Sequence, residues 1–269
     1  MSDACGSNDE KFTPAGVMRS LRAVMPDVLV AVDFDGTLAP LVADPDTSRP
    51  VDGAVDVLTK IAGAGAQVAV VTGRDARTVL RLGGLERIPD VVVAGIYGLE
   101  TWHDGGLTTP DTPEALTTLR RRLPALLAEH DADPAVWIED KRLSLVVHAR
   151  RAADPDAALT PLRRPVQDLA DELGLEMHPG RDVLELRLPG YDKAGALRRL
   201  AGARAGVLYV GDDLGDVPAF GAIKELRADG RTAWGVAVSS SGVAEAAEAA
   251  DVTVAAPEDV VALLRQLVE

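Results

Sequence analysis

The sequence predicts an α/β fold in which a doubly wound parallel-sheet core carries an inserted, smaller α+β domain. From residue 28 to about residue 93, and again after residue 193, short apolar runs alternate with helical patterns. This alternation is typical of a parallel sheet with helices on both faces. Between these stretches, several segments alternate between apolar and polar side chains. Such segments indicate an antiparallel sheet that helices cover on one face only.

Each element of the core follows from its local pattern. Apolar runs bounded by turn residues predict buried strands at residues 28–32, 68–71, 91–94, 207–210, 232–238 and 252–254. Apolar residues at helical spacing predict helices at residues 52–63, 75–82, 193–201, 216–222, 242–249 and 257–268. We therefore assign the core domain to residues 13–100 and 185–269.

The inserted domain is expected at residues 101–184. It begins with a hairpin turn within residues 102–107, and helices are expected at residues 113–130 and 154–173. Pro161 and Pro165 fall within the second helix, so its start is expected after residue 154. The polar face of its sheet is expected to carry Glu139, Lys141, Ser144, His148, Arg150, Glu176, His178, Glu185 and Arg187. This mixture suits a hydroxyl-rich ligand better than a plain solvent face, which is the alternative.

The composition narrows the class of partners. The formal net charge of −14 and the pI near 4.7 argue against nucleic acid and anionic membranes as partners. There is one cysteine, so no disulfide framework is possible within the chain. No run approaches the roughly 18 apolar residues of a membrane span. Residues 1–12 are polar, lack a signal pattern and are expected to be disordered. We expect a cytoplasmic monomer.

Two carboxylates follow the first predicted strand directly. Asp33 and Asp35 lie one residue apart at its carboxyl end, with Gly36 allowing the chain to turn at once. Residues i and i+2 of a strand point to the same side, so both carboxylates can converge on one metal ion or phosphate. The second strand ends in Thr72, Gly73 and Arg74, where a hydroxyl and a backbone N–H can hold a phosphate oxygen. An ordinary Asp-Gly turn is the alternative interpretation of the first motif.

Two further motifs complete the pattern. Lys193 opens a helix just before the strand at residues 207–210, and that strand ends in Asp212, Asp213 and Asp216. Carboxylate clusters of this kind suit a hard divalent cation such as Mg²⁺. A surface ion pair for Lys193 and a helix N-cap for Asp216 are the alternatives. Asp/Asp, Thr, Lys and Asp/Asp/Asp in this order resemble the four motifs of the haloacid-dehalogenase (HAD) phosphatase superfamily.

These residue types suit the hydrolysis of a phosphate ester. Asp33 would attack phosphorus and form an aspartyl-phosphate, while Asp35 would protonate the leaving oxygen and later activate water. Lys193 and Thr72 would hold the non-bridging oxygens. Asp212 is the strongest candidate for a side-chain metal ligand. Asp213 is a further candidate ligand, and Asp216 is expected to support the ligands from behind.

A narrower resemblance rests on longer motifs. The chain from about residue 28 onward resembles the trehalose-6-phosphate phosphatase family through residues 33–40, 97–100, 139–150, 185–187 with 193, and 211–213. The resemblance implies Mg²⁺ on Asp33, on the backbone carbonyl of Asp35 and on Asp212, and a functional link to a trehalose-6-phosphate synthase. It also implies that the substrate is held by Gly73, Arg74, Glu139, Lys141, Ser144, His148, Arg150 and Glu185.

Several positions depart from the family pattern, and other functions stay open. Tyr97 stands where the family often has His, and Gly215 and Val217 stand where it usually has Thr and Glu. The alternatives are a phosphatase for a sucrose, glucosylglycerol or mannosylglycerate phosphate, or a non-catalytic module that binds a sugar phosphate. A non-catalytic module would have no chemical need for all five motif residues, Asp33, Asp35, Thr72, Lys193 and Asp212.

Overall fold

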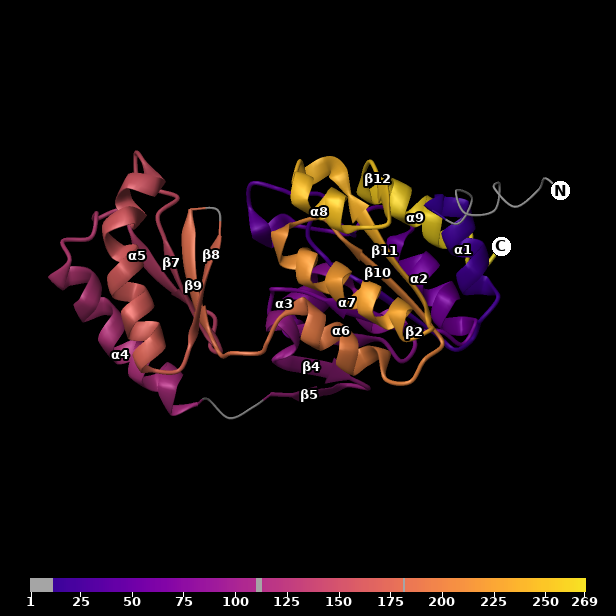
Figure 1. The fold of residues 1–269 in the computed structure, drawn as a ribbon, viewed down its shortest axis with the longest axis horizontal. Coiled ribbons are helices and arrows are strands. Elements are labelled where there is room, and N and C mark those ends of the chain that lie inside the picture. The colour runs from indigo at the N-terminus through magenta and orange to yellow at the C-terminus, as the bar shows by residue number, and fades with distance from the viewer. Residues whose placement is uncertain (1–11, 110–112, 181) are drawn as a thin grey trace. The chain divides into compact units, whose positions relative to one another are not determined.

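The computed structural model describes residues 12–109, 113–180 and 182–269 of the chain. The chain forms two compact units, as Figure 1 shows. The first unit comprises Met1–Thr108 and Asp192–Glu269, and the second comprises Thr109–Tyr191. Residues 1–11 of the expected disordered leader lie outside the described residues. Phe12 is described, and its ring packs edge-on against Trp234 with ring centroids 5.6 Å apart.

The first unit is built on one eight-stranded sheet with the order β12-β11-β10-β1-β2-β3-β4-β5. Its strands are β1 (Val28–Val32), β2 (Gln67–Val71), β3 (Val92–Gly95), β4 (Glu100–His103), β5 (Gly106–Thr108), β10 (Gly206–Gly211), β11 (Thr232–Val238) and β12 (Val252–Val254). All neighbours pair in parallel except β3–β4 and β4–β5, which are antiparallel. The strand order reverses beside β1, and ligands of open α/β sheets bind at such a position.

Helices cover both faces of this sheet. The helices are α1 (Pro14–Arg22), α2 (Ala54–Gly63), α3 (Ala76–Gly83), α6 (Lys193–Ala201), α7 (Val217–Ala228), α8 (Ala244–Ala249) and α9 (Pro257–Arg265). Short 3₁₀ turns lie at η2 (Pro45–Thr47), η3 (Leu85–Arg87), η4 (Ile96–Gly98), η5 (Leu214–Asp216) and η6 (Ser239–Ser241). Because side chains alternate along a strand, Val30 packs in one apolar layer and Ala31 in the other. Helices α1, α2, α3 and α9 line the first layer, and α6, α7 and α8 the second.

Helix α1 was not predicted from the sequence. Thr13 caps it by accepting a hydrogen bond from the Gly16 backbone N–H at 3.1 Å, and Pro14 occupies its first turn. Val17 and Leu21 are buried in the first apolar layer. The Thr13-Pro14 pair was therefore an available start signal, followed by a short amphipathic pattern.

The second unit is a four-stranded antiparallel sheet with the order β6-β7-β9-β8. Its elements are α4 (Glu114–Glu129), β6 (Trp137–Asp140), β7 (Ser144–His148), α5 (Pro155–Glu172), β8 (Glu176–Gly180) and β9 (Val183–Arg187). Helix α5 starts directly after Asp154, so the expected later start is wrong. Pro161 lies inside the helix on an exposed position, where water can satisfy the carbonyl that the ring leaves unpaired.

The bounds of the two units differ from the expected domain bounds of 101 and 184. Residue 101 lies within β4, which pairs with β3 and so belongs to the large sheet. Residue 184 lies within β9, which pairs with β7 and β8 in the small sheet. Strand pairing therefore moves both ends of the inserted unit toward the C-terminus.

The burial of α1 leads to a test of its contribution to stability. Leu21 is fully buried, so Leu21→Ala should lower the free energy of unfolding by about 2–5 kcal/mol. Leu41 is 61% exposed, so Leu41→Ala should change it by less than about 0.5 kcal/mol. Urea titration of both variants measures the two changes. Equal losses would contradict the packing of α1 against the sheet.

Candidate active site

The predicted motifs of the core meet at the carboxyl ends of β1 and β10. These strands are parallel neighbours, with Val32 opposite Val210. The Asp33 backbone N–H continues the pairing by donating to the Val210 carbonyl at 2.9 Å. The loops that follow the two strands therefore start side by side, and they carry the first and last predicted motifs.

A buried acidic cluster forms there from Asp33, Asp212 and Asp216. Their carboxylate oxygens lie within 4.8 Å of one another. Gly36 makes this approach possible, because it has a φ of +79° and a Cβ there would lie 2.0 Å from Asp212 Oδ2. The Thr37 hydroxyl donates to Asp212 Oδ1 at 3.1 Å. The residues of the cluster thus come from two loops that only glycine allows to approach so closely.

Lys193 is the buried cation beside the acidic cluster. It is 3% exposed, and its Nζ lies 2.6 Å from Asp216 Oδ1 and 3.1 Å from Asp33 Oδ2. Burial alone would lower the pKa of Lys193, but Asp216 and Asp33 raise it well above its usual value. A surface ion pair is therefore excluded as the environment of this lysine.

Asp216 holds the site together from behind. Its Oδ1 accepts hydrogen bonds from Lys193 Nζ and from the Tyr209 hydroxyl at 2.5 Å, while its Oδ2 accepts from the backbone N–H groups of Asp212 and Asp213 at 2.8 and 3.0 Å. Burial opposes ionisation, but Lys193 and these hydrogen bonds lower the pKa of Asp216 below its usual value. Both oxygens are thus engaged in orienting other groups.

Asp33 and Asp212 are in a different electrostatic situation. Burial raises the pKa of Asp33 well above its usual value, although Lys193 partly opposes the shift. Burial and repulsion from Asp216 and Asp213 raise the pKa of Asp212 to about 7. Crowded carboxylates of this kind are stabilised in their charged form by a cation.

Asp213 lies beside Lys193 but is more exposed than the residues of the cluster. Its side chain is 56% exposed, and its Oδ1 lies 3.7 Å from Lys193 Nζ. Among the residues that the structure describes, Asp216 and not Asp213 completes the cluster with Asp33 and Asp212. The structure thus groups three of the five acidic residues of the two motifs in this cluster.

Asp35 is held by one residue of its own loop, Ser48, and by one residue of the loop after β2, Arg74. Arg74 binds its carboxylate with two nitrogens, Nε to Oδ2 at 2.5 Å and Nη2 to Oδ1 at 2.7 Å. The hydroxyl of buried Ser48 donates to Oδ1 at 3.0 Å. Sequence reasoning missed Ser48, because it lies in the loop after β1 and in no recognisable motif.

Thr72 and Gly73 lie where the sequence predicted, directly after β2. Thr72 is buried, and its Oγ1 accepts a hydrogen bond from the Arg74 backbone N–H at 3.1 Å. A Cβ on Gly73 would lie 2.9 Å from the Tyr97 hydroxyl oxygen, so the Tyr97 ring lies against this glycine. Tyr97 and Ile96 have φ angles of 56° and 46°, which are unusual for residues with large side chains.

The polar face of the small sheet carries the residues predicted for sugar binding. Glu139 Oε2 lies 2.7 Å from His148 Nε2, and this contact lowers the pKa of Glu139. The Ser144 hydroxyl donates to Glu185 Oε1 at 2.9 Å, and Lys141 Nζ lies 3.8 Å from the same oxygen. The predicted residues thus form two polar groups on one face. Arg150 follows β7 at an exposed position.

Two residues that the sequence did not single out, Trp137 and Arg151, add to the polar groups of this unit. Trp137 stacks on the His148 ring with centroids 4.6 Å apart, and the Arg151 guanidinium lies 4.3 Å from the Trp137 ring centroid. At the other edge, His178 Nε2 lies 3.0 Å from Glu176 Oε2, and its Nδ1 lies 3.1 Å from Arg187 Nη2. Because Arg is always a donor, His178 Nδ1 is the acceptor there.

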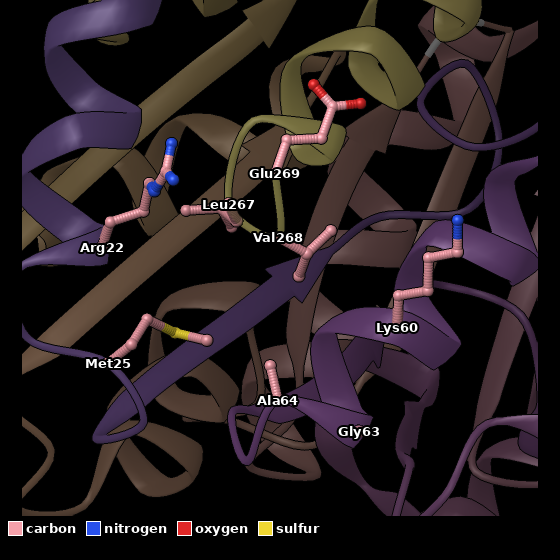
Figure 2. Close-up of a pocket in the computed structure, with 8 residues that line it drawn as sticks. All are labelled: Arg22, Met25, Lys60, Gly63, Ala64, Leu267, Val268 and Glu269. Carbon is pink, nitrogen blue, oxygen red and sulfur yellow. The ribbon is translucent and has the colours of Figure 1, made fainter.

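The first unit has a cavity of about 550 Å³ that is separate from the acidic cluster in its lining residues. Figure 2 shows its lining residues, Arg22, Met25, Lys60, Gly63, Ala64, Leu267, Val268 and Glu269. Met25 precedes β1 and Ala64 precedes β2, so the cavity opens at the amino ends of the strands. None of the predicted site residues lines it.

Among the described residues, no helix is both long and apolar enough to cross a membrane.

Comparison with known proteins identifies the family of the chain. The sequence model of the trehalose-phosphatase family matches residues 31–258. A trehalose-phosphate phosphatase of Mycobacterium avium is 35% identical over 205 residues, which cover 72% of this chain and 51% of that protein. The chain thus spans about half the length of the curated relatives it matches.

Solved structures show the same fold. The C-terminal domain of a Candida albicans trehalose-6-phosphate phosphatase is 22% identical with a TM-score of 0.74, covering 95% of this chain and 96% of that chain. A haloacid dehalogenase-like hydrolase from Bacteroides thetaiotaomicron is 15% identical with a TM-score of 0.65, covering 89% and 98%. With the family match over most of its length, the chain belongs to the trehalose-phosphatase family and has a HAD-like fold.

Proposed function

We propose that the protein is a Mg²⁺-dependent phosphatase that hydrolyses trehalose 6-phosphate to trehalose and phosphate. The observation that carries this proposal is the pairing of Asp33 with Lys193 inside the acidic cluster, in a chain of the trehalose-phosphatase family. Asp33 lies at the strand end where the sheet order reverses. Lys193 lies close enough to neutralise charge on both the nucleophile and a phosphate oxygen.

The first chemical step uses Asp33 and Asp35. An Asp33 carboxylate oxygen bonds to phosphorus while the bond from phosphorus to the sugar oxygen breaks, giving an aspartyl-phosphate. Asp35 donates its proton to the departing sugar oxygen. Lys193, the Thr72 hydroxyl and the Gly73 N–H would contact the non-bridging oxygens. In the second step, Asp35 takes a proton from water, whose oxygen bonds to phosphorus and releases Asp33.

The acidic cluster fits a divalent cation. Asp33 and Asp212 would hold it with their carboxylates, together with the backbone carbonyl of Asp35, and Asp213 is a further candidate. Oxygen donors of this kind suit Mg²⁺, and the raised pKa of Asp212 reflects negative charge that a cation would balance. When bound, the ion would offset the repulsion between the phosphate and the carboxylates. Asp216 would orient Asp212 and Lys193 from behind.

The second unit would recognise the sugar. Glu139, Lys141, Ser144 and Glu185 offer donors and acceptors on one face of its sheet, as a disaccharide with many hydroxyl groups requires. His148 and Arg150 would complete the contacts.

The cellular setting is also part of the proposal. Trehalose 6-phosphate has to be supplied by a synthase, so we expect a functional link to a trehalose-6-phosphate synthase. One cysteine in the chain fits a compartment where thiols stay reduced, as in the cytoplasm. We expect the protein to act as a monomer.

A panel of sugar phosphates tests the proposed substrate. With Mg²⁺, we expect the highest kcat/KM for trehalose 6-phosphate and a loss of at least about 100-fold after chelation of the ion. Asp33→Asn should abolish phosphate release while circular dichroism stays unchanged. Higher kcat/KM for a sucrose, glucosylglycerol or mannosylglycerate phosphate would replace the substrate, and no release from any ester would favour a binding module.

Thermal unfolding tests the cation site without an assay of activity. Saturating Mg²⁺ at about 100 times its Kd should stabilise the protein by about 2.7 kcal/mol, which raises Tm by several degrees. Asp212→Asn should remove this shift without lowering the Tm of the metal-free protein, because it removes one of the repelling carboxylates. A full shift in this variant would place the ion elsewhere.

The polar face is tested by removing one hydroxyl. Ser144→Ala should lower kcat/KM for trehalose 6-phosphate about tenfold, because Glu185 loses a hydrogen bond that orients it. The same variant should hydrolyse p-nitrophenyl phosphate, which has no sugar, at the rate of the wild type. Thr160→Ala removes a comparable hydroxyl on the opposite, helical side of this unit and serves as the control. Equal losses on both substrates would contradict the role in sugar recognition.

A further inference from the structure

The carboxylate of Asp35 is held in one orientation by Ser48 and Arg74, which we call the brace. Arg74 grips it with two parallel hydrogen bonds of 2.5 and 2.7 Å, and Ser48 adds a third of 3.0 Å. A guanidinium that binds both oxygens of a carboxylate fixes its plane as well as its position. The brace therefore determines where the Asp35 oxygens point.

The brace is itself anchored at both ends. A third nitrogen of Arg74, Nη1, donates to the Pro45 carbonyl at 2.9 Å, and its guanidinium lies 5.9 Å from the Phe34 ring centroid. Ser48 is fully buried, and its backbone N–H bonds to the Pro45 carbonyl at 3.3 Å. Arg74 thus links the end of β2 to the loop after β1, which is the loop that carries both Asp35 and Ser48.

The hydrogen bonds of the Arg74 guanidinium indicate that it orients Asp35 and does not mainly bind phosphate. All three of its guanidinium nitrogens donate to protein oxygens, two of them to Asp35. A residue whose main task was to bind phosphate would be expected to point its fork at the cluster of Asp33 and Lys193. The side chains of Arg74 and Asp35 are 17% and 31% exposed, so the held carboxylate remains open to a substrate.

We infer that Ser48 and Arg74 are positioning residues that orient the Asp35 carboxyl for proton transfer to the leaving sugar oxygen. The inference rests on the proposed function, because it assigns Asp35 the transfer described there. As the bond from phosphorus to the sugar oxygen breaks, that oxygen receives the Asp35 proton, and the same carboxylate later accepts a proton from water. A misdirected carboxyl would slow both transfers while phosphate binding stayed intact.

Two substrates with different leaving groups distinguish the orientation of Asp35 from the binding of phosphate. A sugar alkoxide needs a proton to depart, whereas p-nitrophenolate is stable enough to leave without one. We expect Arg74→Lys, which keeps the charge and loses the fork, to lower kcat/KM for trehalose 6-phosphate about 100-fold. Ser48→Ala should lower it about fivefold. On p-nitrophenyl phosphate the kcat/KM of both variants should stay within about threefold of the wild type, because kcat/KM covers only the steps up to the departure of the leaving group and not the later transfer from water.

A double-mutant comparison tests whether Arg74 acts through Asp35. In an Asp35→Asn background, a further Arg74→Lys change should cost less than about threefold on either substrate, because the group it orients is already gone. Arg81→Lys is the matched control, since Arg81 pairs with a carboxylate of Asp46 at an exposed position. It should leave both rates unchanged. Thermal unfolding checks that the variants are folded.

Each other outcome overturns a different statement. Equal losses on the sugar ester and the nitrophenyl ester would assign Arg74 to phosphate binding and overturn the inference. So would wild-type rates in Arg74→Lys, or an undiminished loss in the Asp35→Asn background. A wild-type protein that hydrolyses neither trehalose 6-phosphate nor any other ester would instead overturn the proposed function.

Discussion

The site depends on one electrostatic balance, in which a buried lysine offsets several buried carboxylates. Lys193 contacts Asp33 and Asp216 directly, and isolated buried charges of either sign would be strongly destabilising. One carboxylate oxygen of Asp216 accepts from the Lys193 ammonium group, and the other accepts from the backbone after β10. Asp216 therefore fixes both groups relative to each other. The negative charge of Asp33 and Asp212 is only partly offset by Lys193, as the raised pKa values of both carboxyls indicate. In our proposal, a divalent cation offsets the rest.

The fold supplies this balance by placing loop starts next to each other. Parallel strands β1, β2 and β10 end at one edge, so the residues after each strand converge without long excursions of the chain. Gly36 then allows the first loop to press against Asp212, and Tyr209 reaches Asp216 from within the buried strand. The positions of the carboxylates in the acidic cluster are therefore set by the strand ends and by Gly36.

Much of this could be predicted from the sequence, because periodicity and strand ends are local signals. The predicted strand at residues 232–238 has the bounds of β11, and the helix at 193–201 has those of α6. The convergence of Asp33 and Asp212 was expected from the order of the motifs at the strand ends. Ser48 could not be found, because its contact with Asp35 is set by the path of a loop. Tyr209 left a weaker signal, since a phenol inside an apolar strand needs a buried partner.

The place of the inserted unit in the chain has a consequence for how such proteins diversify. The second unit ends at Tyr191, and Lys193 follows almost at once as the first residue of α6, a helix that Asp192 caps. Carboxylates of the first unit anchor the Lys193 ammonium group. Among the described residues, the ion pairs of the ammonium group are all with carboxylates of the first unit. An ancestral insertion could be lengthened, shortened or replaced at this junction without rebuilding the machinery beside it. New specificities could then arise by exchange of one module while an old reaction is retained.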